Sequence, residues 1–144
     1  MAAGPWLFTD ASIASMLDGT FNVDGDTFKM ALHVSTGTQP AAGTTAWSAL
    51  SDSQCTDTGY TAGGEACDLQ VTGTTTVKVD IGTDPVWTAG AGGITAKWAV
   101  IYEVAGNVLC YCLLESGGAD VTATEGNTLT VAAHTSGVYT VTTA

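Results

Sequence analysis

The stretch Gly93–Glu115, GITAKWAVIYEVAGNVLCYCLLE, predicts the centre of the fold. It holds two apolar runs separated by Gly106-Asn107, a two-residue signal for a type I′ or II′ hairpin turn. Successive side chains of a strand point to opposite faces, so each run divides into two sets. The sets are Ile94, Ala96, Trp98, Val100 and Tyr102 against Lys97, Ala99, Ile101 and Glu103, then Leu109, Tyr111 and Leu113 against Val108, Cys110, Cys112 and Leu114. Neither face is cleanly polar, so we expect core on one side and another layer or chain on the other.

Other segments alternate in the same way and predict further strands. In the run 27–34, Phe28, Met30, Leu32 and Val34 are expected to face inward, and Lys29, Ala31 and His33 outward. In the run 74–81, Val77, Val79 and Ile81 are expected inside, and Lys78 and Asp80 outside. Two last strands are expected at 128–132 and 137–142.

The N-terminal segment predicts an arm followed by one short helix. Thr9 or Asp10 is placed to cap a helix that continues to Leu17 and stops at Asp18-Gly19. Its apolar face would carry Ile13, Met16 and Leu17. The segment 47–50 reads as a short strand or a turn.

Together these segments predict an all-β chain. Seven or eight short strands, with turn signals every ten to fifteen residues, favour a single antiparallel β-sandwich, either jelly-roll-like or immunoglobulin-like. At 144 residues the chain has the size of one domain. We expect one domain over residues 1–144, with 1–20 as the arm and short helix.

The charge balance argues against two classes of partner. The chain has three lysines, no arginine and a net charge of -11. Nucleic-acid binding and attachment to anionic membranes both need cations, so we expect neither. The acidity either keeps the surface soluble or complements a basic partner. No apolar run reaches the roughly 20 residues of a membrane span, and the N-terminus lacks a secretory pattern, so we expect cytosolic synthesis with reduced thiols.

The cysteines and acidic pairs predict no metal and no cofactor. Cys110 and Cys112 share a strand face and cannot easily bond each other, and a C-x-C without a nearby histidine is a weak zinc signal. Cys55 and Cys67 flank a glycine-rich turn and form either a disulfide or two buried thiols. Asp24-Gly25-Asp26 fails the EF-hand spacing, and Gly59–Gly64 lacks the flanking residues of a nucleotide loop.

The sequence offers little for catalysis. No G-x-S-x-G motif occurs, and the candidate general bases are His33 on a strand and His134 in a turn. Carboxylates are plentiful, but their spacing identifies no glycosidase pair. We therefore expect no enzymatic activity, with a hydrolase as the reading to exclude.

Four segments carry a resemblance to a known group. They are DTFKMAL (26–32), GYTAGG (59–64), WT with ITAKWAVIY (87–88 and 94–102), and EGNTLTV (125–131). In this order they are similar to a group of small virion structural proteins of tailed bacteriophages, over nearly the whole chain. The resemblance implies a capsid decoration (cement) protein that binds the outer head lattice as a homotrimer and stabilises it.

Several expectations follow from that resemblance. The partner would be the major capsid protein, and the protein would reside on the virion after synthesis in the bacterial host cytoplasm. Candidate interface residues are the apolar terminus and the hairpin aromatics: Trp6, Leu7, Phe8, Trp98, Tyr102 and Tyr111. The alternative is a tail or fibre component with a receptor- or glycan-binding role, built on aromatics such as Trp47 or Trp87.

Overall fold

Antiparallel β-strands dominate the computed structural model, which describes residues 4–143. Within those residues the helices are α1 (Asp10–Leu17) and the short 3₁₀ helix η1 (Trp47–Ser53). The predicted all-β class is therefore confirmed.

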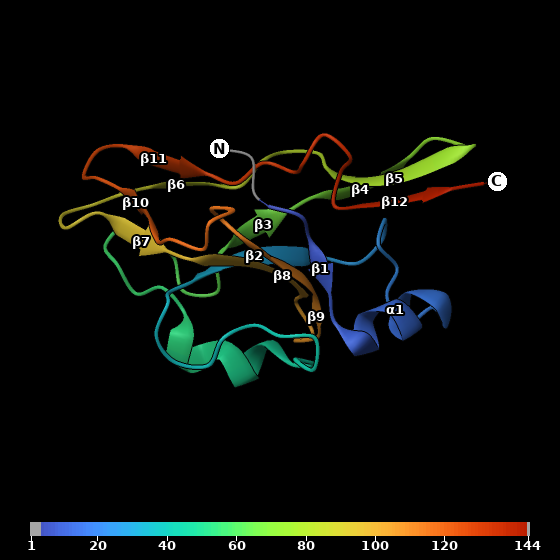
Figure 1. Ribbon diagram of the computed structural model, residues 1–144, viewed down its shortest axis with the longest axis horizontal. Coiled ribbons are helices and arrows are strands. Elements are labelled where there is room, and N and C mark those ends of the chain that lie inside the picture. The colour runs from blue at the N-terminus through green and yellow to red at the C-terminus, as the bar shows by residue number, and fades with distance from the viewer. Residues whose placement is uncertain (1–3, 144) are drawn as a thin grey trace.

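A five-stranded sheet, here called the main sheet, forms the middle layer (Figure 1). In spatial order its strands are β1 (Leu7–Phe8), β9 (Val108–Leu113), β8 (Trp98–Glu103), β2 (Phe28–His33) and β3 (Glu65–Cys67). The hairpin predicted at 93–115 supplies β8 and β9, so it does lie at the centre.

Three small sheets form a second β layer on one side of the main sheet, while α1 and η1 lie on the other side (Figure 1). The small sheets pair β10 (Val121–Ala123) with β7 (Ile94–Ala96), β11 (Thr128–Thr130) with β6 (Val86–Thr88), and β12 (Tyr139–Thr142) with β5 (Thr76–Ile81) and β4 (Leu69–Thr72). Because this second layer is divided, a single two-sheet sandwich is not confirmed.

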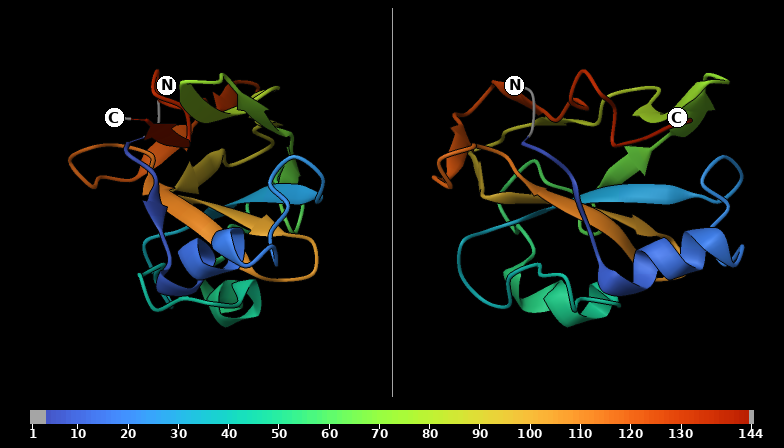
Figure 2. Two further views of the ribbon diagram at one scale, coloured as in Figure 1. Left: turned by 90° about the vertical axis from the view of Figure 1, so that its right-hand side faces the viewer. Right: turned by 45° about the vertical axis from the view of Figure 1, so that its right-hand side comes forward.

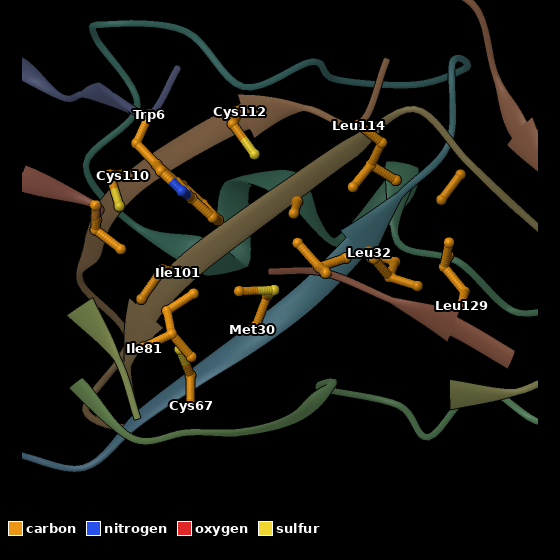
Figure 3. Close-up of a cluster of buried hydrophobic side chains, with 14 of the residues drawn as sticks. Trp6, Met30, Leu32, Cys67, Ile81, Ile101, Cys110, Cys112, Leu114 and Leu129 are labelled. Carbon is orange, nitrogen blue, oxygen red and sulfur yellow. The ribbon is translucent and has the colours of Figure 1, made fainter. Parts of the chain in front are cut away.

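Both faces of the main sheet are buried, as the apolar hairpin requires. The larger cluster, the main core, lies between the main sheet and the small sheets (Figure 3). The smaller one, here called the aromatic cluster, contains Tyr102 and Tyr111 together with Ala31, Leu50, Val100 and Val108. Its cover is η1, which comes from the same chain, so this face of the main sheet is covered within the chain.

The hairpin turn is longer than predicted. The connection between β8 and β9 runs from Val104 to Asn107, and the N–H of Gly106 donates to the carbonyl of Glu103 at 2.7 Å. Gly106 adopts a φ of 109°, a conformation that glycine tolerates without steric cost. The two residues Gly106-Asn107 are thus the second half of a four-residue loop.

A β-bulge changes which β9 side chains share a face. Ile101 pairs with Cys110 and Tyr102 pairs with Val108, so Leu109 is an extra residue. Val108 consequently lies in the aromatic cluster with Tyr111, and Leu109 lies in the main core. Strict alternation predicted the opposite faces for Val108 and Leu109, and that prediction was wrong at these two positions.

A break at Lys97 changes the first run. Lys97 separates β7 from β8; its N–H donates to the carbonyl of His33 and its carbonyl accepts from the N–H of Leu114. Ile94 and Ala96 therefore lie in the main core and do not share a face with Trp98. Within β8 the predicted alternation holds.

On β2 the inward set is confirmed and the outward set is not. Phe28, Met30 and Leu32 lie in the main core. Ala31 and His33, predicted to face solvent, are both fully buried because η1 covers that face. The segment 47–50, predicted as a strand or turn, is the start of this cover.

The helix is confirmed with its cap. The hydroxyl oxygen of Thr9 accepts from the N–H of Ser12, and α1 ends at Leu17 with Asp18 as its C-cap. Met16 packs against the main core, whereas Ile13 and Leu17 are 50% and 85% exposed. The expected common apolar face is therefore only partly used.

The loop at 59–64 makes close contacts with β8, with β2 and with Gln54, and we call this set of contacts the clasp. The hydroxyl of Tyr102 donates to the carbonyl of Gly63 at 2.7 Å, and the N–H of Gly63 donates to the side-chain oxygen of Gln54. Gly64 lies directly against the backbone of Met30, where an added Cβ would overlap the carbonyl group. Only glycine allows so close an approach.

This clasp predicts a large difference between two glycine substitutions. Gly64 and Gly126 have nearly equal φ values, 78° and 79°, but a Cβ on Gly126 meets no atom within 4 Å. Gly126→Ala should cost about 1–2 kcal/mol for the left-handed backbone alone. Gly64→Ala should cost about 2 kcal/mol more because of the overlap with Met30. Urea unfolding of both variants measures the difference in the free energy of unfolding. Equal losses of stability would contradict the close contact between Gly64 and the Met30 backbone.

Candidate functional site

The predicted hairpin aromatics pack against residues of the same chain. The ring of Trp47 stacks on Tyr102 with centroids 4.6 Å apart and planes 8° apart. Trp98 meets Tyr111 edge-on, and its ring N–H donates to Gln39 at 2.7 Å. The apolar surplus that suggested a subunit contact at Trp98, Tyr102 and Tyr111 is therefore covered within the protein itself.

The three predicted residues of the N-terminal arm lie in different environments. Trp6 is 7% exposed and packs in the main core (Figure 3). Leu7 is 48% exposed. Phe8 is partly buried and meets the ring of Tyr139 edge-on at 5.1 Å. Of the six predicted interface residues, Leu7 is thus the most open to solvent.

An open groove runs between the arm and β12. Its volume is about 590 Å³. Pro5, Trp6 and Phe8 line one side, and Val138, Tyr139 and Thr140 line the other. The lining is mainly apolar, and Tyr139 belongs both to this groove and to the three-stranded sheet.

That sheet carries an exposed apolar face. It extends beyond the main sheet at the end of the molecule where α1 lies (Figure 2). Tyr139 and Val71 both pair with Val79, and Val141 pairs with Val77, so these side chains share one face. Val71, Tyr139 and Val141 are 43%, 37% and 47% exposed, and Val77 is partly exposed. We call Val71, Val77, Tyr139 and Val141 the apolar strip.

An acidic hollow adjoins the apolar strip. It measures about 220 Å³ and is lined by Asp24, Asp26 and Asp68, with Phe28 and Leu69 at its base. Leu69 precedes Val71 by two residues on β4 and therefore has the same side-chain direction. The hollow and the strip are therefore neighbours along β4: Asp68 and Leu69 line the hollow, and Val71 belongs to the strip.

The acidic hollow is not arranged as a metal centre. Asp26 already accepts a hydrogen bond from the N–H of Asn22 at 2.7 Å. Among residues 4–143, no group of three or more His, Cys, Asp or Glu side chains is placed to hold a metal ion.

In the same part of the chain, no helix is both long and apolar enough to cross a membrane.

The two histidines lie in different environments. His33 is fully buried, and its Nδ1 is 3.0 Å from the hydroxyl of Ser53, which itself donates to the carbonyl of Leu50. Burial lowers the pKa of His33 to about 4, while the Leu50 carbonyl and the Asp52 charge oppose that shift. His134 is exposed in a turn. The Ser53–His33 pair has a serine next to a base, but no substrate can reach it without opening of η1.

All four cysteines lie within the described residues and are free, buried thiols. The structure therefore has no Cys55–Cys67 bond and matches the second of the two readings of this pair. Cys110 and Cys112 share the main core, as predicted. Burial raises the pKa of Cys55 to about 11 and that of Cys67 to about 12, so neither is a reactive thiolate near neutral pH.

Sequence reasoning missed the apolar strip and the acidic hollow. Val77 and Val79 were predicted as inside residues of one strand, and Val77 is in fact partly exposed. The strand β4, which brings Val71 and Asp68 to this surface, was not predicted at all. The signal available was the Leu-Gln-Val-Thr alternation beside the charged Asp68.

No family model, no curated protein and no solved structure matches this chain. Its function therefore has to be argued from the residues and the surface just described.

The buried histidine predicts a pH-dependent stability. Above pH 6.5 His33 is neutral in both states; between pH 6.5 and about 4 only the unfolded chain binds the proton, so stability falls as the pH falls. The loss should reach about 3 kcal/mol at pH 4. His33→Asn keeps a polar atom near Nδ1 but cannot titrate, and should remove this part of the loss.

The measurement is the free energy of unfolding at pH 7 and pH 4 for both forms. His134→Asn is the matched control, because His134 is exposed. It should lose as much stability as the unaltered protein. Equal losses for His33→Asn and His134→Asn would show that His33 is not buried in its neutral form.

The thiols predict a simple labelling result. At pH 8 the folded protein should react with a thiol reagent far more slowly than a free cysteine, because all four sulfurs are buried and their thiolate forms are disfavoured. In denaturant, without any reductant, four thiols per chain should react. Only two reactive thiols would reveal a disulfide.

Proposed function

We propose that this chain is a virion structural protein of a tailed bacteriophage, a capsid decoration protein that binds the outer head lattice and stabilises it. The observation that carries the proposal is the apolar surface from Phe8 through Tyr139 to Val71, in which Tyr139 and Val71 are exposed to solvent. The resemblance of the four sequence segments supports the same role. In this role the protein is made in the host cytoplasm and resides on the capsid surface.

A decoration protein needs a rigid fold and an adhesive surface, and it needs no catalysis. Two fully covered faces of the main sheet favour rigidity. The serine–histidine pair is sealed, which supports a protein without enzymatic activity. Exposed apolar surface on a soluble protein commonly marks a contact with another protein.

The partner is the major capsid protein, and the bound form is a homotrimer. A stable contact of this kind buries more than about 1,000 Å² in total. The apolar strip alone is smaller than that, so the contact includes the neighbouring groove or the exposed side chains of Leu7, Ile13 and Leu17. With a net charge of -11, the chain is poorly suited to nucleic acid or to an anionic membrane.

The alternative role in a tail or fibre depended on exposed aromatics. Trp87 is 1% exposed and lies in the main core. Trp47 is partly buried because it stacks on Tyr102. Trp87 is therefore closed to a sugar, and one face of Trp47 is already occupied by Tyr102, which favours the decoration role over a glycan-binding one.

The proposal predicts binding to capsids that lack this protein. Purified protein should cosediment with such capsids of its own phage, and the capsids should then resist heat or dilution better than bare ones. Sedimentation velocity should detect trimers in solution or on elution from capsids. A protein that stays monomeric and leaves capsids unbound and unstabilised would overturn the proposal. Retained capsid binding by His33→Asn would separate this role from any chemistry at His33.

A further inference from the structure

The surface formed by the apolar strip and the acidic hollow has an uneven charge distribution. Asp24 and Asp68 are exposed beside the hollow, and Asp26 is partly exposed. Lys78, the lysine of β5, pairs with Asp80 and has the side-chain direction opposite to that of Val77 and Val79. No lysine is among the described residues that line the hollow. The surface is thus apolar along the sheet and negative at one end.

A second copy of the chain does not complement this surface. Each copy has only three lysines against fourteen acidic residues, so two copies meeting here would bring carboxylates together. Like charges at a contact oppose association, whereas cations from a different protein would be attracted.

The edges of the three-stranded sheet also suit a protein segment. β4 and β12 are its two outer strands, and neither contains a charged residue or a proline. Natural sheets commonly block open edges with lysine, proline or bulges, because an unblocked edge pairs with a further strand. The uncharged edges and the exposed apolar strip therefore point to the same kind of occupant, an extended segment with apolar side chains.

We propose that the apolar strip and the acidic hollow together bind a partner protein segment that carries apolar side chains beside lysine or arginine. The apolar side chains of the segment pack on Val71 and Val141, and its cations lie at the hollow near Asp24. This inference deepens the proposed function and rests on it for the identity of the partner, which would be a basic segment of the capsid protein.

The first test uses a defined probe. It is a labelled synthetic peptide of about 12 residues with valine at alternate positions of one half and lysine in the other half, long enough to cross the sheet edge. One control peptide has glutamate in place of lysine, and another has serine in place of valine. Fluorescence anisotropy at low salt should detect binding of the lysine–valine peptide, with both controls at least about tenfold weaker. Equal binding of the glutamate peptide would overturn the charge assignment.

Matched variants locate the contact. Val71→Thr combined with Val141→Thr keeps the β-branched shape and should weaken peptide binding about tenfold, through loss of two buried methyl groups. Val86→Thr with Val104→Thr is the control pair, since these valines are 47% and 55% exposed elsewhere. Equal weakening by both pairs would overturn the proposal. Thermal unfolding establishes that each variant is folded.

Charge variants test the acidic part of the surface in the same way. Asp24→Asn should weaken binding of the lysine–valine peptide about two- to fivefold, as expected for one exposed charge pair. Glu125→Gln, at another exposed carboxylate, should leave it unchanged. Added salt should reduce binding to the unaltered protein more than binding to Asp24→Asn. A salt response equal in both would show that Asp24 takes no part.

A capsid-binding experiment distinguishes failure of this inference from failure of the proposed function. If the unaltered protein binds capsids and the Val71→Thr, Val141→Thr variant binds them equally well, the function stands and the inference fails. If the peptide results hold but no form binds capsids, the proposed function fails and the chemistry assigned to the surface stands.

Discussion

The whole structure depends on a central hairpin that is apolar on both faces. Each face of β8 and β9 must be removed from water, and burying one large apolar side chain contributes about 1.5–3 kcal/mol. Three small sheets cover one face, and η1 covers the other. The two covers come from chain segments far apart in sequence, so the hairpin organises the fold around it.

Because both faces of the central hairpin are covered, the exposed apolar surface lies at the periphery of the fold. Tyr102 and Tyr111 lie in the aromatic cluster with Leu50 of η1, and Trp87 points from β6 into the main core, so these aromatics act in packing. The three-stranded sheet extends past this cover, and its inner residue Val79 is buried while Val71 and Val141 are exposed. The exposed apolar surface therefore lies where the three-stranded sheet extends past the layer that covers it, and this is the surface proposed to bind a partner.

Alternation and capping rules predicted the elements whose faces are set locally. They identified β2, β5, β8, β9 and the Thr9 cap, because each depends on neighbours two to four residues away. They failed where distant contacts decide: the bulge at Leu109 and the cover over His33 depend on η1 and on the pairing of β9. The candidate surface was missed for the same reason, since β4 brings Asp68 to Asp24 only in the folded chain.

Acidity and exposed apolar surface have connected effects in this protein. An open apolar strip favours self-association, but a net charge of -11 opposes it between identical copies. Repulsion is strongest where carboxylates cluster, and Asp24 and Asp68 both line the hollow at the start of β4. The proposed homotrimer is therefore expected to use a contact away from this end, such as the side carrying Leu7, where the exposed side chain is uncharged. On this proposal the strip stays open for a cationic partner, so that assembly and partner binding use separate surfaces.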